Sequence, residues 1–116
     1  MTQDYIGTKQ ITAWEQEKDG QPGYAVKYAD GYVSWSPREV FEAAYLPMGH
    51  VGHLPPHQQR VIGEKVQLDD KVQKLNDFIG TEFFKTLPDA EQDRLLRQAM
   101  SMRDYATVLE ERIGAF

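Results

Sequence analysis

The sequence contains no cysteine, and this absence excludes disulfide bonds, thiolate catalysis and cysteine-ligated metal sites. It also lacks any apolar run near the roughly 20 residues that a helix needs to cross a bilayer, so no membrane partner is expected. Met1–Tyr5 has neither the basic start nor the following apolar stretch of a signal peptide. Positive charge is scarce too, since 13 basic and 18 acidic residues give a net charge of −5. This balance argues against a nucleic-acid polymer as partner, because phosphate neutralisation dominates such binding, but a few arginines can still hold a small anion.

The N-terminal part of the chain, residues 1–46, is rich in β-branched and aromatic residues, which are typical of strands. Tyr5–Trp14 is predicted to be a first strand and Glu15–Gly23 a polar loop, because the loop contains Asp-Gly and Pro-Gly pairs. Ser36–Tyr45 is predicted to be a short helix, since it begins with a capping serine followed by a proline. These segments together predict a small antiparallel β module.

A hairpin is predicted within Gly23–Ser36, where Asp30-Gly31 separates two alternating runs. Asp-Gly is the composition of a tight two-residue turn, in which both central residues take positive φ. Opposite residues of an antiparallel pair share a face of the sheet, so this turn decides which side chains meet. Two opposed pairs are predicted to share one face: Tyr28 with Val33, and Val26 with Trp35. Lys27 and Ser34 are predicted to lie on the other face.

A linker rich in proline and glycine, residues 47–56, follows the β module. The linker and the residue after it hold all three histidines, His50, His53 and His57. A zinc site would need three neutral imidazoles that converge around an open fourth position. Two prolines force extended backbone between the second and third histidines, and no carboxylate follows closely to orient the rings. We therefore interpret the histidines as hinge residues and expect no metal, no cofactor and no catalytic centre.

The C-terminal part, residues 57–116, is predicted to be a helical hairpin domain. Apolar residues of the first helix are spaced four, three and four apart, at Leu68, Val72, Leu75 and Ile79. From Leu95 to Ile113 the second helix carries an uninterrupted three-four repeat. Two helices of similar length with a short connector predict an antiparallel hairpin, and the predicted fold class is α+β. A second apolar strip predicts self-association into an oligomer: Leu96, Met100 and Val108.

The ends of this hairpin carry the candidate binding groups. Arg60 near the start of the first helix and Arg112 near the end of the second are predicted to converge, and paired guanidinium groups suit a phosphate. The alternative is that Arg112 forms a simple ion pair with the glutamates beside it. Phe83 and Phe84 lie in the connector, where they either close the helical core or stack on the base of a neighbouring subunit's ligand. Adjacent carboxylates in both helices point to different sides, so no acid–base pair and no enzyme activity are expected.

The chain resembles phage anti-defence proteins over nearly its whole length. The stretch YADGYVSWSPREVFEAAY (Tyr28–Tyr45) resembles a small β module of tailed-phage proteins. His57–Ile79 and Phe84–Ile113, with LDDKVQKL and SMRDYATVLEERI, resemble a helical-hairpin domain shared by two families. One family counters Thoeris immunity by capturing cyclic ADP-ribose signals, and the other counters CBASS immunity by capturing cyclic dinucleotides. The order of β module and then hairpin is similar to the Thoeris anti-defence sponge of the first type, whereas the CBASS family is similar only in the hairpin.

This resemblance implies a sponge that binds a cyclic ADP-ribose isomer in the host bacterial cytoplasm, leaves it intact and so blocks Thoeris immunity. It also implies a homo-oligomer, from dimer to hexamer, and in some members separate pockets take cyclic di- and trinucleotides. By position, Arg60 and Arg112 match the residues with which the family binds the ligand's phosphates. Phe83 or Phe84 matches the aromatic residue that stacks on the adenine, and the sequence does not choose between them.

Three other functions stay open at this point. A sponge for cyclic oligonucleotides only would use a different pocket from that of Arg60 and Arg112. An enzyme that cleaves the signal would need the histidine cluster as its metal site. A phage adaptor protein would bind no nucleotide and would use the exposed helical strips to bind other proteins.

Overall fold

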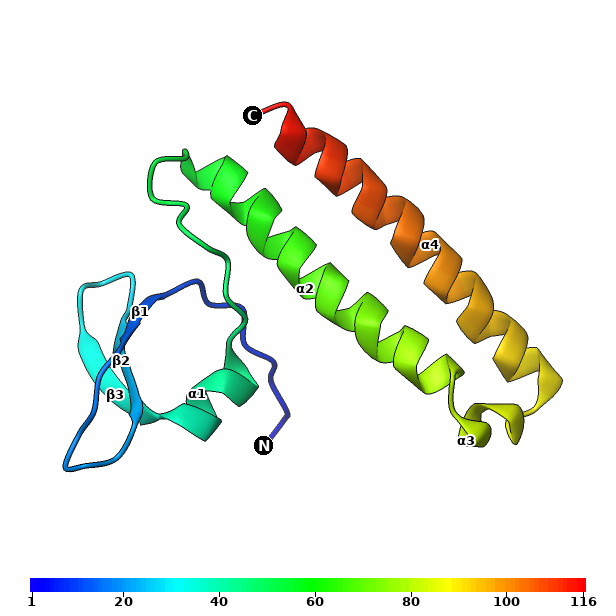
Figure 1. Cartoon of the computed structure of the whole chain (residues 1–116), viewed down its shortest axis with the longest axis horizontal. Helices are drawn as coiled ribbons and strands as arrows, with labels where there is room; N and C mark the ends of the chain where they lie inside the picture. Colours follow the sequence, from blue (N-terminus) through cyan, green and yellow to red (C-terminus); the bar gives the residue numbers. More distant parts are fainter. The chain divides into compact units, whose positions relative to one another are not determined.

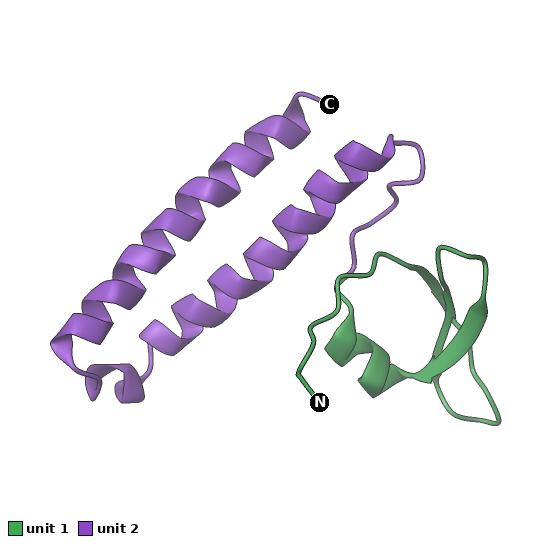
Figure 2. Ribbon diagram, turned by 180° about the vertical axis from the view of Figure 1, so that it is seen from behind, with its two compact units in different colours: residues 1–46 green, residues 47–116 purple.

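The computed structural model describes all 116 residues and divides the chain into two compact units, Met1–Leu46 and Pro47–Phe116 (Figure 2). The elements of the first unit are β1 (Thr12–Glu15), β2 (Gly23–Lys27), β3 (Val33–Pro37) and α1 (Arg38–Ala44). Those of the second are α2 (Pro56–Ile79), α3 (Glu82–Lys85) and α4 (Asp89–Gly114) (Figure 1). The predicted α+β class is confirmed, with an antiparallel sheet and a short helix followed by a helical hairpin. None of the helices combines the length and apolar composition that a membrane crossing requires.

In the first unit the three strands form one antiparallel sheet in the order β1-β2-β3. Helix α1 packs on β2 and β3, and the rings of Tyr24 and Phe41 stack with their centroids 4.1 Å apart. The Tyr24 hydroxyl donates a hydrogen bond of 2.8 Å to the Glu42 carboxylate, and this bond raises the pKa of Tyr24 above its usual value. Ala25 and Val26, both 2% exposed, form the small core of this unit.

The first strand is shorter than predicted. The sequence indicated Tyr5–Trp14, but regular pairing covers only Thr12–Glu15. Pairing begins at Thr12, which lies opposite Lys27, because β2 ends there and the chain turns away. The residues before Thr12 therefore have no strand to bond to, and β propensity alone does not make a strand.

The hairpin between β2 and β3 differs from the predicted register by one residue. Lys27 lies opposite Val33, and Val26 lies opposite Ser34 instead of Trp35. The prediction that Val26 and Trp35 share a face is therefore wrong. Because side chains alternate along a strand, this shift of one residue moves Trp35 to the face opposite Val26.

The cause is the length of the connection between the strands. The Gly31 N–H donates to the Tyr28 carbonyl and the Tyr28 N–H donates to the Tyr32 carbonyl, both at 2.9 Å, so three residues form the loop. Gly31 takes φ +91°, while Asp30 stays outside the positive-φ region and accepts a hydrogen bond from the Tyr32 N–H at 2.9 Å. A turn followed by one left-handed glycine is the usual geometry of a three-residue hairpin loop.

In the second unit α2 and α4 pack along each other as an antiparallel hairpin, as the apolar repeats predicted. Val61, Leu68 and Leu109 form its buried centre, and Leu109 is 0% exposed. The partly buried residues packed against this centre come from both helices: Val72, Met102, Ala106 and Ile113. The hairpin therefore buries one stripe of each helix and leaves the opposite stripes exposed.

Candidate ligand-binding site

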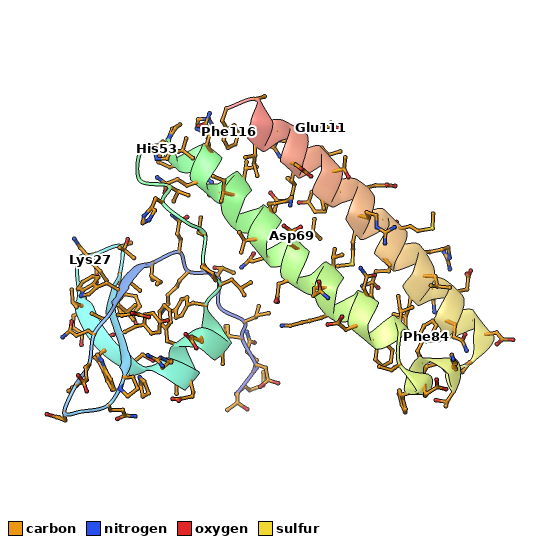
Figure 3. All side chains as sticks on the ribbon, in the orientation of Figure 1. Lys27, His53, Asp69, Phe84, Glu111 and Phe116 are labelled. Atoms are coloured by element: carbon orange, nitrogen blue, oxygen red, sulfur yellow. The ribbon has the colours of Figure 1, made fainter.

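The open end of the hairpin, where α2 begins and α4 ends, carries the two predicted arginines. Arg60 lies near the first turn of α2 and Arg112 in the last turn of α4, and the antiparallel packing brings both to this end. Figure 3 labels His53, Glu111 and Phe116 at the same end of the hairpin. Both arginine side chains are exposed to solvent, as a site for a phosphate ligand requires.

Arg60 and Arg112 form no ion pair, and neither does Arg103, whereas the other two arginines of the hairpin each have an acidic partner. Arg94 bonds to Glu91 at 2.8 Å and Arg97 to Asp93 at 2.9 Å, so these cations are neutralised within one helix. Neither Arg60 nor Arg112 takes part in an ion pair, although two glutamates precede Arg112 directly. The structure therefore does not contain the local ion pair between Arg112 and the adjacent glutamates that was the alternative prediction.

The structure does not bring the three histidines into a metal site. His50 and His53 are exposed in the linker, and His57 is exposed in the first turn of α2. No group of three or more histidine and acidic side chains lies close enough to hold a metal ion. Pro55, with φ −64° and ψ 155°, keeps the chain extended immediately before the helix and so separates His53 from His57.

At the closed end, the two phenylalanines of the connector have different surroundings. Phe84 is 7% exposed and Phe83 is 64% exposed. Thr81 caps α3 by accepting a hydrogen bond from the Phe84 N–H at 3.3 Å, and both rings meet Phe78 edge to face at about 6 Å. Phe84 therefore closes the end of the helical core, whereas Phe83 presents its ring to solvent.

The candidate arginines and Phe83 of one chain lie too far apart to hold the same small ligand. Arg60 lies near the first turn of α2, and Phe83 follows the last turn of this 24-residue helix. At 1.5 Å per residue the helix is about 36 Å long. A ligand of nucleotide size that contacts Phe83 together with Arg60 or Arg112 must therefore lie between two copies of the chain.

The two adjacent aspartates of α2 each form an ion pair with a lysine of the same helix. Asp69 bonds to Lys65 at 2.6 Å and Asp70 to Lys74 at 2.9 Å, each one turn away on the same helix. The two neighbours thus point to different sides of α2, and exposed pairs of this kind form a solvated face.

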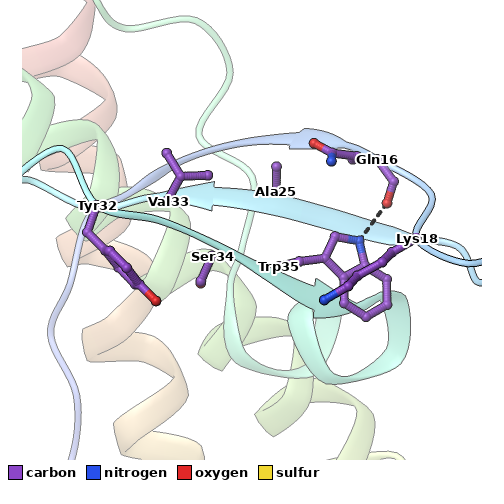
Figure 4. Close-up of a pocket in the computed structure, with 7 residues that line it drawn as sticks. All are labelled: Gln16, Lys18, Ala25, Tyr32, Val33, Ser34 and Trp35. Atoms are coloured by element: carbon purple, nitrogen blue, oxygen red, sulfur yellow. Dashed lines mark hydrogen bonds between the residues drawn. The ribbon is translucent and has the colours of Figure 1, made fainter.

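Sequence reasoning missed a pocket in the first unit, because it placed Trp35 on the wrong face of the sheet. The pocket has a volume of about 470 Å³ and is open to solvent (Figure 4). Its lining residues come from β2, β3 and the ends of two loops: Gln16, Lys18, Ala25, Tyr32, Val33, Ser34 and Trp35. The sequence feature that could have indicated this pocket is a lysine in the polar loop, Lys18, together with the aromatic residues of the predicted hairpin. This feature is only a weak indication of a pocket.

The hairpin thus has arginines without ion pairs at its open end and an exposed aromatic ring at its closed end. A family model described as Sequestin matches residues 55–115, which is more than half of the chain. The chain therefore belongs to the Sequestin family of phage sponge proteins, the family that counters Thoeris and CBASS immunity. This confirms the resemblance stated from the sequence.

A phage relative supports this assignment. An uncharacterized 7.5 kDa protein from the denB-rIIB intergenic region of Enterobacteria phage T4 is 42% identical over 60 residues. The aligned residues make up 94% of that protein but 52% of this chain, so the relative has no counterpart of nearly half of this chain. No solved structure matches this chain.

Proposed function

We propose that this protein sequesters a cyclic ADP-ribose isomer in the host bacterial cytoplasm, without cleaving it, and thereby blocks Thoeris immunity. The observation that carries the proposal is the pair of unpartnered arginines, Arg60 and Arg112, at the open end of a Sequestin-family hairpin. Two exposed guanidinium groups at one end of the hairpin give this end a local positive charge, which attracts an anion. A diphosphate suits them, because each planar fork can donate two hydrogen bonds to one phosphate.

The aromatic contact in this proposal belongs to Phe83 and not to Phe84. The ring of Phe83 is exposed and can stack on an adenine, whereas Phe84 is needed to close the helical core. Since Phe83 and the arginine pair lie at opposite ends of the hairpin, the ring comes from a second copy. The site is therefore complete only in a homo-oligomer, in the range from dimer to hexamer.

Burial between two copies also suits a sponge that must release its ligand slowly. Exclusion of water strengthens the arginine–phosphate hydrogen bonds, and a site preformed by rigid helices avoids the cost of ordering flexible segments on binding. No general acid, base or metal is needed, because the ligand is held and not transformed. The apolar strip formed by Leu96, Met100 and Val108, which are 47%, 65% and 51% exposed, is a surface on which copies can assemble.

Calorimetric titration with a cyclic ADP-ribose isomer tests the proposal. The wild-type protein is expected to bind tightly, and heating the complex should return the ligand unchanged on chromatography. Arg60→Ala and Arg112→Ala should each weaken binding by about 1.5–3 kcal/mol, the usual value of a hydrogen bond to a charged group. Phe83→Ala should also weaken binding, through the loss of base stacking.

Arg97→Ala is the matched control, because Arg97 is an exposed arginine of the same hairpin that is already paired with Asp93. It should leave the affinity unchanged. Equal losses in Arg97→Ala and Arg112→Ala would mean that overall charge, and not a site, attracts the ligand. Recovery of a cleaved ligand would establish an enzyme, and no binding of any nucleotide would favour the phage adaptor.

A second candidate is a sponge for cyclic di- or trinucleotides only. The family match is confined to residues 55–115, the part of the chain that resembles both the Thoeris and the CBASS sponges. The two candidates use different pockets, so titration of the Arg60→Ala/Arg112→Ala variant separates them. Cyclic oligonucleotide binding that survives in this variant, with no cyclic ADP-ribose binding in the wild type, would favour the second candidate.

A further inference from the structure

The pocket of the first unit is built around a tryptophan whose orientation is held from two sides. The indole N–H of Trp35 donates to the Gln16 carbonyl oxygen at 2.7 Å (Figure 4). On its other side the ring lies against Gly23, where an added methyl group would come within 2.4 Å of the Trp35 Cζ2 atom. The ring is therefore fixed before any ligand arrives, and a preorganised aromatic surface lowers the entropic cost of binding.

A cation without an acidic partner lies at this ring. The Lys18 Nζ atom is 5.6 Å from the centroid of the Trp35 ring and forms no ion pair. Figure 4 shows the lysine beside the ring. An exposed cation–π contact is weaker than a charge-assisted hydrogen bond to a phosphate, so an anionic ligand can draw the ammonium group away from the ring.

Polar groups and a second aromatic ring complete the lining. Tyr32 is 64% exposed, and its ring stacks on that of Tyr28 at a centroid distance of 6.0 Å. Ser34 also lines the pocket, and its hydroxyl donates to the Tyr28 hydroxyl oxygen at 3.4 Å. Hydroxyls beside an aromatic wall and a cation suit a planar ring that carries a sugar and a phosphate.

We propose that this pocket is a second ligand site, which binds a nucleoside phosphate with its base against Trp35 and its phosphate on Lys18. The site lies outside the matched residues 55–115 and uses none of the hairpin groups. It is therefore independent of the function proposed above. A volume of about 470 Å³ falls in the range of pockets for small ligands.

The fluorescence of Trp35 gives a direct test with AMP as the probe. The chain has two tryptophans, so a Trp14→Phe variant leaves Trp35 as the only one. AMP is expected to change its fluorescence in a saturable way, and adenosine, which absorbs light equally but has no phosphate, should bind more weakly. Ribose 5-phosphate, which lacks the base, should also bind more weakly than AMP.

Two variants in the Trp14→Phe background locate the site. Lys18→Ala should weaken AMP binding about tenfold, because the phosphate loses a charged partner. Lys9→Ala is the matched control, since the Lys9 Nζ atom lies 4.8 Å from the Tyr28 ring in the same unit but does not line the pocket. It should leave AMP binding unchanged.

The Arg60→Ala/Arg112→Ala variant separates this proposal from the function of the hairpin. AMP binding should persist in this variant, where binding of the cyclic ADP-ribose isomer is lost. Calorimetry on chains that keep Trp14 repeats the AMP comparison without the tryptophan substitution. No saturable AMP binding, equal losses in Lys18→Ala and Lys9→Ala, or loss of AMP binding in the double arginine variant would each overturn the second site.

Discussion

The two units of this protein differ in what decides which side chains face the interior. In the helical hairpin the residues of the three-four repeat are all buried or half-buried, from Leu68 on α2 to Ile113 on α4. A shift of a helix boundary by one residue would leave this pattern intact, because the helical period continues through the segment. In the β module a single extra residue in one loop moves Trp35 to the other face. Helix packing thus depends on periodicity, whereas strand packing depends on its turns.

The β module contains its own comparison, because the dipeptide Asp-Gly occurs in both hairpin loops. At Asp19-Gly20 both residues have positive φ, 52° and 79°, and Lys18 pairs with Gln21 across a two-residue turn. At Asp30-Gly31 only the glycine has positive φ, and the loop has three residues. The tight turn that the sequence predicted at the second dipeptide is found at the first.

The largest expected effect is a loss of stability in the helical hairpin that leaves the sheet of the first unit unchanged. Leu109→Ala should destabilise the second unit by about 2–5 kcal/mol, because Leu109 is fully buried and its truncation leaves a cavity. Val108→Ala, at a neighbouring residue that is 51% exposed, should change stability by less than about 0.5 kcal/mol. Far-ultraviolet circular dichroism during denaturation follows the helices. Similar losses in both variants would contradict the inferred packing.

In the sheet, the substitution expected to destabilise the first unit is Gly23→Ala. Its new methyl group would meet the Ser36 carbonyl oxygen and the Trp35 ring at 2.4 Å, so the first unit should lose about 1–3 kcal/mol of stability. Gly7→Ala is the control, since nothing lies within 4 Å of an added methyl group there. Both tryptophans lie in the first unit, so their fluorescence reports its unfolding. Unchanged stability in Gly23→Ala would mean that the indole does not lie against this glycine.

The smallest expected effects are the changes in stability on substituting the aspartates of the two Asp-Gly loops, and they test whether the loops differ in backbone geometry. Asp19→Gly should be neutral or slightly stabilising, because glycine adopts positive φ without strain. Asp30→Gly should cost about 1 kcal/mol, because it removes the hydrogen bond to the Tyr32 N–H and adds flexibility where φ is not positive. Tryptophan fluorescence during denaturation measures both changes. Equal effects would indicate that the two loops share one geometry.

The candidate site was predictable to the extent that it depends on helix ends. Arg60 and Arg112 were placed together because two long helices joined by a short connector must run antiparallel. The sequence could not predict that Arg112 forms no ion pair with the glutamates beside it. Ion pairs between flexible exposed side chains contribute little free energy and depend on local geometry. The sequence also could not tell which of Phe83 and Phe84 is exposed, because the two side chains are chemically identical and differ only in the side of the short helix from which they project.

The sequence by itself determined the α+β class, the helical hairpin with its buried stripes, and membership of a sponge family. These properties follow from periodicity, composition and motifs, which are local and repeat along many residues. Tertiary structure alone decided the register of β2 and β3, the exposure of Phe83 and the pocket around Trp35. The register and the pocket depend on contacts between residues distant in the chain, and a difference of one residue in a turn is enough to change both.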